Sequence, residues 1–199
     1  MRGVDAVIDL HNFDMLTSIM GVVVTSSDKQ LHQKNMNLMN AFSPKQVWLL
    51  NPLGEENRFS GCLGVALNQL GIPNIAVELN HPKIISEEQV AQCVKGVLRV
   101  LSSLKILDFD GAFDAIDKPF PVFARSVLTA HCSGIFHAKV QLGDVILPGQ
   151  SIGTMTLVPE FERYDLFSHH EGEVMQVLKD GFVHPGQELM AIGRMVHHD

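Results

Sequence analysis

Residues 71–80 read Gly-Ile-Pro-Asn-Ile-Ala-Val-Glu-Leu-Asn, and this stretch shows how the first half of the chain is built. Gly71-Ile72-Pro73 ends the amphipathic segment before it, because proline has no N–H and cannot continue a helix. The apolar run over residues 74–79 then predicts a buried strand. A helix, a break and a strand in this order are typical of an α/β layer.

The same alternation of apolar runs and amphipathic stretches fills residues 1–106. Further strands are predicted over residues 6–10, 21–25 and 47–50, and helices over residues 27–42, 59–70 and 86–104. The last helix has the clearest signal, since Ser86 is a candidate N-cap and Glu87 and Glu88 place negative charge in its first turn. We therefore predict an α/β domain over residues 1–106.

Asp, Gly and Pro are frequent over residues 107–121, which predicts a linker. Residues 122–199 then contain two similar copies of a short pattern. Ser133-Gly134-Ile135-Phe136, Gly143-Asp144 and Pro148-Gly149-Gln150 are echoed by Glu171-Gly172-Glu173-Val174, Gly181 and Pro185-Gly186-Gln187. Each copy reads as strand, Gly turn, strand, Pro-Gly turn, strand, and two copies predict a small all-β barrel-sandwich domain like lipoyl and biotinyl carrier domains. A carrier needs an exposed lysine between its halves, and residues 158–164 contain none, so we expect a structural or substrate-shaping role.

Composition excludes several classes of protein. The chain has 15 Lys and Arg against 22 Asp and Glu, a formal net charge of −7, whereas a nucleic-acid surface requires a basic stripe. No apolar run approaches the roughly 18 residues of a membrane helix, and Asp5 and Asp9 interrupt any secretory signal. The three cysteines have no Cys-x-x-Cys spacing and are expected to be reduced thiols. We therefore expect a folded, cytoplasmic protein that binds neither membrane nor nucleic acid.

One strand ends in a histidine. The run Val7-Ile8-Asp9-Leu10-His11 would deliver an imidazole to the mouth of the sheet, where α/β proteins assemble their sites. Asp9 lies two residues earlier and therefore on the same strand face, from which it would orient the ring or a bound water. The alternative is a structural histidine with no role in chemistry.

Two further residues are candidates for catalysis or binding. Glu78 stands at the end of an apolar strand, where lost hydration would raise its pKa towards that of a general base; the alternative is a solvated carboxylate. Arg58 would hold a substrate carboxylate by a bidentate pair, or else be a solvated surface residue.

Taken together, these segments resemble one enzyme family. The chain resembles the succinylglutamate desuccinylase and aspartoacylase family in four features. They are Asp9-Leu10-His11, the Gly71-Ile72-Pro73 break before Glu78-Leu79, the long helix and the doubled β domain. The resemblance implies a zinc-carboxypeptidase-like three-layer α/β fold with a mixed sheet, here incomplete, followed by the barrel-sandwich domain. It also implies a zinc-dependent hydrolase that removes the acyl group from an N-acyl amino acid or a related small amide. By this resemblance, His11 is a zinc ligand and Glu78 the general base.

The chain also departs from the family pattern. The family's other two metal ligands lie in a His-Gly-x-Glu type segment upstream, and here only ten residues precede His11 and contain no His-x-x-Glu. A catalytic zinc needs three protein ligands and an open position for water. Where the family has Gly after the glutamate segment, this chain has Leu79-Asn80-His81, which makes His81 either a substrate contact or a surface residue.

Three interpretations remain open. The chain is a shortened form of the enzyme, an inactive remnant that acts as a binding or assembly module, or one part of a site completed by another chain. A missing first segment would leave an unpaired sheet edge and exposed apolar surface, so we expect a homo-oligomer or poor solubility.

Overall fold

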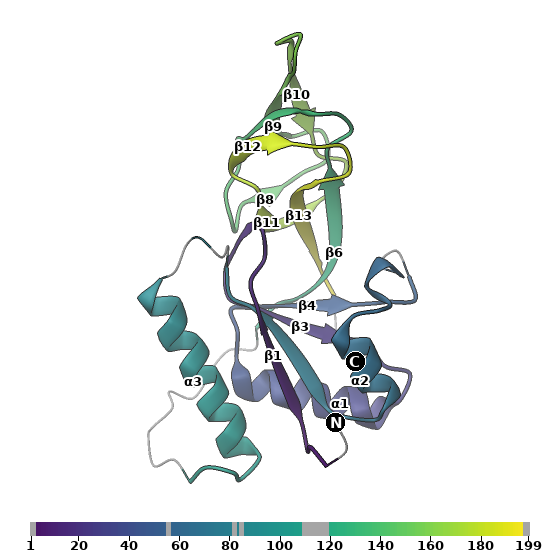
Figure 1. The fold of residues 1–199 in the computed structure, drawn as a ribbon, viewed down its shortest axis with the longest axis vertical. Helices are drawn as coiled ribbons and strands as arrows, with labels where there is room; N and C mark the ends of the chain where they lie inside the picture. Colours follow the sequence, from purple (N-terminus) through teal and green to yellow (C-terminus); the bar gives the residue numbers. More distant parts are fainter. Residues whose placement is uncertain (1–2, 55–56, 81–82, 84–85, 109–119, 197–199) are drawn as a thin grey trace. The chain divides into compact units, whose positions relative to one another are not determined.

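A computed structural model describes residues 3–54, 57–80, 83, 86–108 and 120–196 (Figure 1). The chain forms two compact units. The first comprises Met1–Asn12, Ile19–Leu79 and Lys83–Val122, and the second comprises Phe13–Ser18, Asn80–Pro82 and Phe123–Asp199. The boundaries predicted from the sequence placed residues 13–18 and 80–82 in the first domain. In the described part of these segments, Leu16 and Thr17 pair with Val177 and Gln176, and Asn80 accepts hydrogen bonds from the N–H groups of Phe13 and Thr17. A boundary drawn along the chain does not capture such contacts. Most of the predicted linker, residues 109–119, lies outside the described residues.

The first unit contains a mixed sheet of four strands in the order β1-β5-β3-β4. These strands are β1 (Val7–His11), β5 (Asn74–Glu78), β3 (Met20–Val24) and β4 (Gln46–Leu50). β1 runs parallel to β5 and β3 parallel to β4, whereas β3 runs antiparallel to β5. Every residue of β3 is buried, as expected for a central strand with both faces covered.

The described part of this unit also contains three α-helices: α1 (Lys29–Phe42), α2 (Leu63–Gln69) and α3 (Glu87–Ser103). Their starts follow from capping residues. The Asp28 carboxylate accepts hydrogen bonds from the N–H groups of Gln30 and Leu31, and Ser86 Oγ accepts one from Gln89 N–H. The helix predicted over residues 59–70 is interrupted in the structure. A 3₁₀ turn, η1 (Asn57–Phe59), precedes α2, because Ser60-Gly61 breaks the regular backbone between them.

Helices cover both faces of the sheet. A Cβ on Gly21 would lie 2.3 Å from Met39 Sδ of α1, and a Cβ on Gly64 of α2 would lie 2.7 Å from Val24 Cγ2. Residues 21 and 24 of β3 point to opposite faces, so α1 and α2 pack on opposite sides. α3 packs on α1 through Gly96, where a Cβ would lie 2.7 Å from the Phe42 ring. None of the helices in the described ranges combines the length and apolar character that a membrane span requires.

The second unit is built from β-strands. One group follows the order β6 (Val122–Thr129), β13 (Glu188–Met195), β11 (Gly172–Val177) and β2 (Leu16–Thr17), with β8 (Val145–Ile146) also paired to β11. The second sheet has the order β10 (Arg163–Phe167), β9 (Ser151–Leu157), β7 (Gly134–Ala138) and β12 (Asp180–Val183). The two copies predicted from the sequence correspond to β7-β8-β9 and β11-β12-β13.

The two copies exchange strands. Copy one contributes β7 and β9 to the sheet that contains β12 of copy two, and copy two contributes β11 and β13 to the sheet that contains β8 of copy one. Their buried side chains accordingly form a shared cluster of Ile146, Ile152, Val174, Val177, Met190 and Ile192. The Pro-Gly turns match as well, because Gly149 and Gly186 have φ values of +81° and +82°, a conformation that favours glycine.

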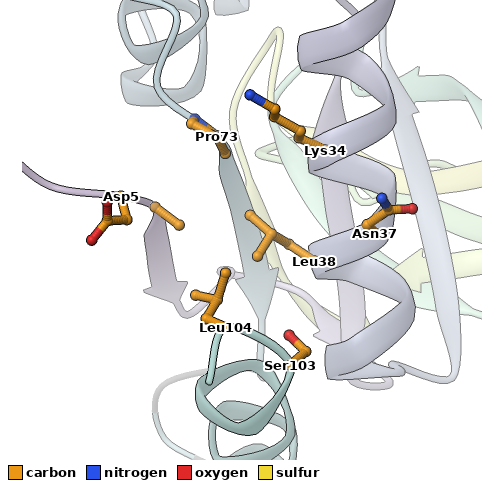
Figure 2. Close-up of a pocket in the computed structure, with 8 residues that line it drawn as sticks. Asp5, Lys34, Asn37, Leu38, Pro73, Ser103 and Leu104 are labelled. Atoms are coloured by element: carbon orange, nitrogen blue, oxygen red, sulfur yellow. The ribbon is translucent and has the colours of Figure 1, made fainter. Parts of the chain in front are cut away.

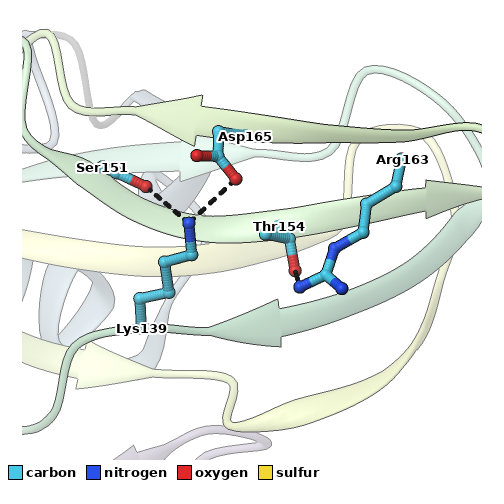
Figure 3. Close-up of polar contacts among 5 residues, drawn as sticks. All are labelled: Lys139, Ser151, Thr154, Arg163 and Asp165. Carbon is cyan, nitrogen blue, oxygen red and sulfur yellow. Dashed lines mark hydrogen bonds and ion pairs between the residues drawn. The ribbon is translucent and has the colours of Figure 1, made fainter.

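A polar network ties strands of the second sheet together (Figure 3). Lys139 Nζ lies 2.8 Å from Asp165 Oδ1 and 3.2 Å from Ser151 Oγ, and Arg163 donates to Thr154 Oγ1 at 3.3 Å. Lys139, which follows β7, therefore contacts Ser151 of β9 and Asp165 of β10. It does not lie in the turn that joins β9 to β10, where a carrier domain would have its exposed lysine.

Candidate functional site

His11 and Glu78 are the last residues of two neighbouring strands. β1 and β5 are parallel, and His11 is the register partner of Glu78. The Leu79 N–H donates to the His11 carbonyl oxygen at 2.9 Å, which extends the pairing one residue beyond the strands. Because parallel strands end at the same edge of a sheet, the two side chains emerge side by side although 67 positions separate them in the sequence.

Two carboxylates approach the imidazole of His11. Asp9 Oδ1 lies 3.0 Å from His11 Nε2, and Glu78 Oε1 lies 3.6 Å from His11 Nδ1. The first distance is that of a hydrogen bond and the second is longer than one. Each ring nitrogen of His11 therefore has a carboxylate within ion-pair distance, and Asp9 is the nearer of the two. Asp9 therefore lies on the same strand face as His11, as the sequence predicted.

Glu78 is largely removed from water. Its residue exposure is 6%, whereas the side chain of His11 is 51% exposed. Ile75 and Val77, which are 1% and 0% exposed, hold the preceding strand in the core, and Met20 of β3 is the register partner of Glu78 on its other side. The carboxylate is thus fixed by packed neighbours next to a half-exposed imidazole, an arrangement suited to moving a proton at the rim of the sheet.

The structure does not join Arg58 to this group. Arg58 lies in η1, with its guanidinium 4.6 Å from the Phe59 ring centroid, and Phe59 in turn makes an edge contact with Trp48. Its loop follows β4, which runs antiparallel to β5 and so ends at the opposite edge of the sheet from Glu78. The described contacts therefore link Asp9, His11 and Glu78, and Arg58 is not among them.

His81 lies outside the described residues, but its neighbour Asn80 is anchored. Asn80 accepts hydrogen bonds from Phe13 N–H at 3.1 Å and, through Oδ1, from Thr17 N–H at 3.2 Å. The sequence did not predict the path of the chain after Glu78. The one local indication of a turn there was Asn80, because asparagine is common in turns.

The described residues include His11, the predicted zinc ligand, but no complete metal centre. No group of three or more His, Cys, Asp and Glu side chains in the described ranges is arranged to hold a metal ion. His11 has the nitrogen donor and the orienting carboxylate of a zinc ligand, but a catalytic zinc takes three protein ligands. His137, another histidine of the chain, pairs with Asp180 in the second unit. The zinc set implied by the family resemblance is therefore not completed by these residues.

Comparison with known proteins gives matches among solved structures. No family model and no curated protein matches this chain. A succinylglutamate desuccinylase/aspartoacylase from Rhodobacter sphaeroides matches with a TM-score of 0.82 at 15% identity, over 98% of this chain and 60% of that one. The product-bound ectoine utilization protein EutE (DoeB) from Ruegeria pomeroyi matches with a TM-score of 0.82 at 18% identity, over 96% and 58%. An aspartoacylase family protein from Mesorhizobium loti matches with a TM-score of 0.77 at 18% identity, over 98% and 58%.

These matches confirm the predicted resemblance at the level of the fold. Nearly the whole chain superimposes on structures of the succinylglutamate desuccinylase/aspartoacylase family. The described residues of this chain form a mixed α/β architecture with large sheets and three α-helices. The chain spans about 60% of the length of the structures it matches.

Proposed function

We propose that this chain forms part of a metal-dependent hydrolase that removes the acyl group from an N-acyl amino acid or a related small amide. The observation that carries the proposal is the contact between His11 and Glu78 at the ends of adjacent parallel strands, 3.6 Å apart, in a fold shared with desuccinylases and aspartoacylases. We further propose that the first unit is a zinc-carboxypeptidase-like layer and the second a barrel-sandwich.

Glu78 would act as the general base. Its carboxylate would take a proton from an attacking water, whose oxygen bonds to the amide carbonyl carbon. When the C–N bond breaks, the same carboxylic acid would return the proton to the leaving amine. Burial of Glu78 supports this role, because packed neighbours hold the carboxylate in place beside His11.

His11 would be a zinc ligand, with Asp9 as its orienting partner. Zinc, when bound, supplies polarisation of the carbonyl and acidification of water. Since the described residues provide one ligand, the others would come from outside the described set or from another chain. Arg58 remains a proposed contact for the substrate carboxylate and His81 a proposed substrate contact; Arg58 has the weaker support because β4 ends at the opposite sheet edge.

Activity and metal content test the proposal together. The purified chain, supplied with zinc, would be assayed against a panel of N-acyl amino acids by detection of the released amine. We expect hydrolysis, and one zinc per active site that is lost in His11→Ala. His184→Ala is the matched control, because His184 lies in the second unit and contacts Phe182. Hydrolysis and zinc content that are both unchanged in His11→Ala would refute the role of His11.

The incomplete ligand set favours a second candidate, a catalytically inactive remnant that acts as a binding or assembly module. This candidate predicts no hydrolysis and no retained zinc under the same conditions, while the protein still folds and associates. Metal analysis after dialysis, combined with the assay, separates the two.

A further inference from the structure

A pocket lies in the first unit, away from His11 and Glu78 (Figure 2). It has a volume of about 410 Å³ and is formed where α1, the end of α3 and the starts of β1 and β5 meet. Asp5 precedes β1 and Pro73 precedes β5, whereas His11 and Glu78 end these strands. Five residues of strand separate the two places by roughly 15 Å, so they are distinct sites. The volume falls within the range of small-molecule sites, roughly 300–1,000 Å³.

One side of the pocket presents hydrogen-bond donors from α1. Lys34 and Asn37 are three positions apart and so share a helix face. Asn37 Oδ1 already accepts from Gln33 Nε2 at 3.0 Å, which leaves the Asn37 amide N–H groups as donors. The Lys34 ammonium makes no ion pair with any residue in the described ranges. This side is therefore suited to a carboxylate.

The other side presents acceptors. Asp5 contributes a carboxylate, and Ser103 Oγ donates to the Val100 carbonyl at 2.8 Å, which leaves its lone pairs free to accept. α3 ends here at its C-cap Leu104, where the carbonyl end of the helix carries a partial negative charge, and Lys105 follows directly. This side is suited to an ammonium group.

Apolar side chains lie between the two. Figure 2 shows Leu38 and Leu104 pointing into the space between Asp5 and Lys34. Leu38 is 5% exposed and Leu104 36%, so the floor is packed and the rim is open. A ligand with only an anionic group would place that group near the Asp5 carboxylate, and a ligand with no charge would pair with neither Asp5 nor Lys34.

We propose that this pocket binds a free α-amino acid with an apolar side chain in its zwitterionic form. The carboxylate would contact Lys34 and Asn37, the ammonium would contact Asp5 and Ser103, and the side chain would pack on Leu38 and Leu104. This binding site is independent of the hydrolase chemistry proposed for His11 and Glu78.

Calorimetric titration of the full chain with L-leucine and L-phenylalanine tests the proposal. We expect binding at up to millimolar concentration, weakened about tenfold or more for 4-methylpentanoate, which lacks the ammonium, and for L-leucinamide, which lacks the carboxylate. Lys34→Gln and Asp5→Asn should each weaken L-leucine binding by a similar factor. Lys29→Gln, in the first turn of the same helix, is the matched control and should bind as the unaltered protein does. Circular dichroism of each variant checks that it folds.

Two results would overturn the proposal. The first is the absence of binding heat with both amino acids. The second is binding that is lost in His11→Ala or Glu78→Gln and kept in Lys34→Gln, because the amino acid would then occupy the candidate active site. Failure of hydrolysis with intact L-leucine binding would count against the proposed function alone.

Discussion

The imidazole of His11 and the carboxylate of Glu78 are register partners on adjacent parallel strands, with His11 Nδ1 3.6 Å from Glu78 Oε1. Asp9 contacts the other ring nitrogen at 3.0 Å. One aromatic ring thus lies between two carboxylates of different burial. In the proposed function, the more buried carboxylate is the base and the other orients the ring.

The first prediction concerns Glu78. Glu78→Gln preserves the shape of the side chain but removes the proton acceptor, so the rate of amide hydrolysis should fall by about 10²- to 10⁴-fold. Steady-state kinetics on the best substrate of the panel measures this. Glu87→Gln, at an exposed position of α3, should leave the rate unchanged. A Glu78→Gln variant with full activity would exclude Glu78 as the base.

The second prediction concerns Tyr164, the single tyrosine of the chain. A hydrogen bond with the Cys132 thiol, followed by burial, raises the pKa of Tyr164 from 10.0 to about 12. Because the folded pKa lies above the unfolded one, Tyr164 contributes stability that is complete below pH 10.0 and is lost as the pH rises towards 12. Absorbance at the tyrosinate wavelength after rapid pH jumps should show the raised midpoint, and Cys132→Ala should lower it. A midpoint near the ordinary value in the unaltered protein would contradict the contact.

The third prediction concerns Gly96 in α3. Alanine favours a helix over glycine by about 1 kcal/mol, but a Cβ at this position would lie 2.7 Å from the buried Phe42 ring. Overpacking costs about 1–3 kcal/mol, so Gly96→Ala should lower the free energy of unfolding. Gly61→Ala is the matched control, since no atom lies within 4 Å of its added Cβ. Urea titration compares the two variants, and a more stable Gly96→Ala protein would show that α3 does not pack on α1 as described.

The fourth prediction concerns the thiols. Cys93 is buried in α3, and burial raises the pKa of its thiol, whereas Cys62 and Cys132 are only partly covered. The thiolate is the reactive form, so Cys93 should react with a thiol reagent much more slowly than the other two. Peptide mapping after brief labelling assigns the rates, with the unfolded protein as the reference in which all three react alike. Rapid labelling of Cys93 in the folded chain would contradict its burial.

The fifth prediction concerns association. β1 is an edge strand of the first unit, and Leu10 on it is 46% exposed. An exposed edge that carries an apolar side chain favours pairing with another chain, so we expect a homo-oligomer that Leu10→Lys weakens. Light scattering over a range of concentrations measures this. Leu53→Lys, at a loop position that is 92% exposed, should have no effect. A monomer at all concentrations would refute the edge interface.

The sequence by itself determined the local elements. Ser86 and the two glutamates after it set the start of α3, apolar runs set the strands of the first unit, and the doubled Pro-Gly pattern marked both copies in the second unit. The period-two rule placed Asp9 beside His11. These features depend on neighbours a few residues apart, where backbone geometry and burial leave few alternatives.

Only the tertiary structure decided the order and pairing of the strands. Three of these pairings join segments far apart in the chain. β3 lies between β5 and β4 and runs antiparallel to β5, the two copies exchange strands, and Leu16–Thr17 pairs with β11. Two further features follow from those pairings. Arg58 lies at the sheet edge opposite to His11 and Glu78, and Asp5 and Lys34 line the same pocket. Such contacts are set by the packing of whole faces against one another, and local sequence patterns do not encode which face meets which.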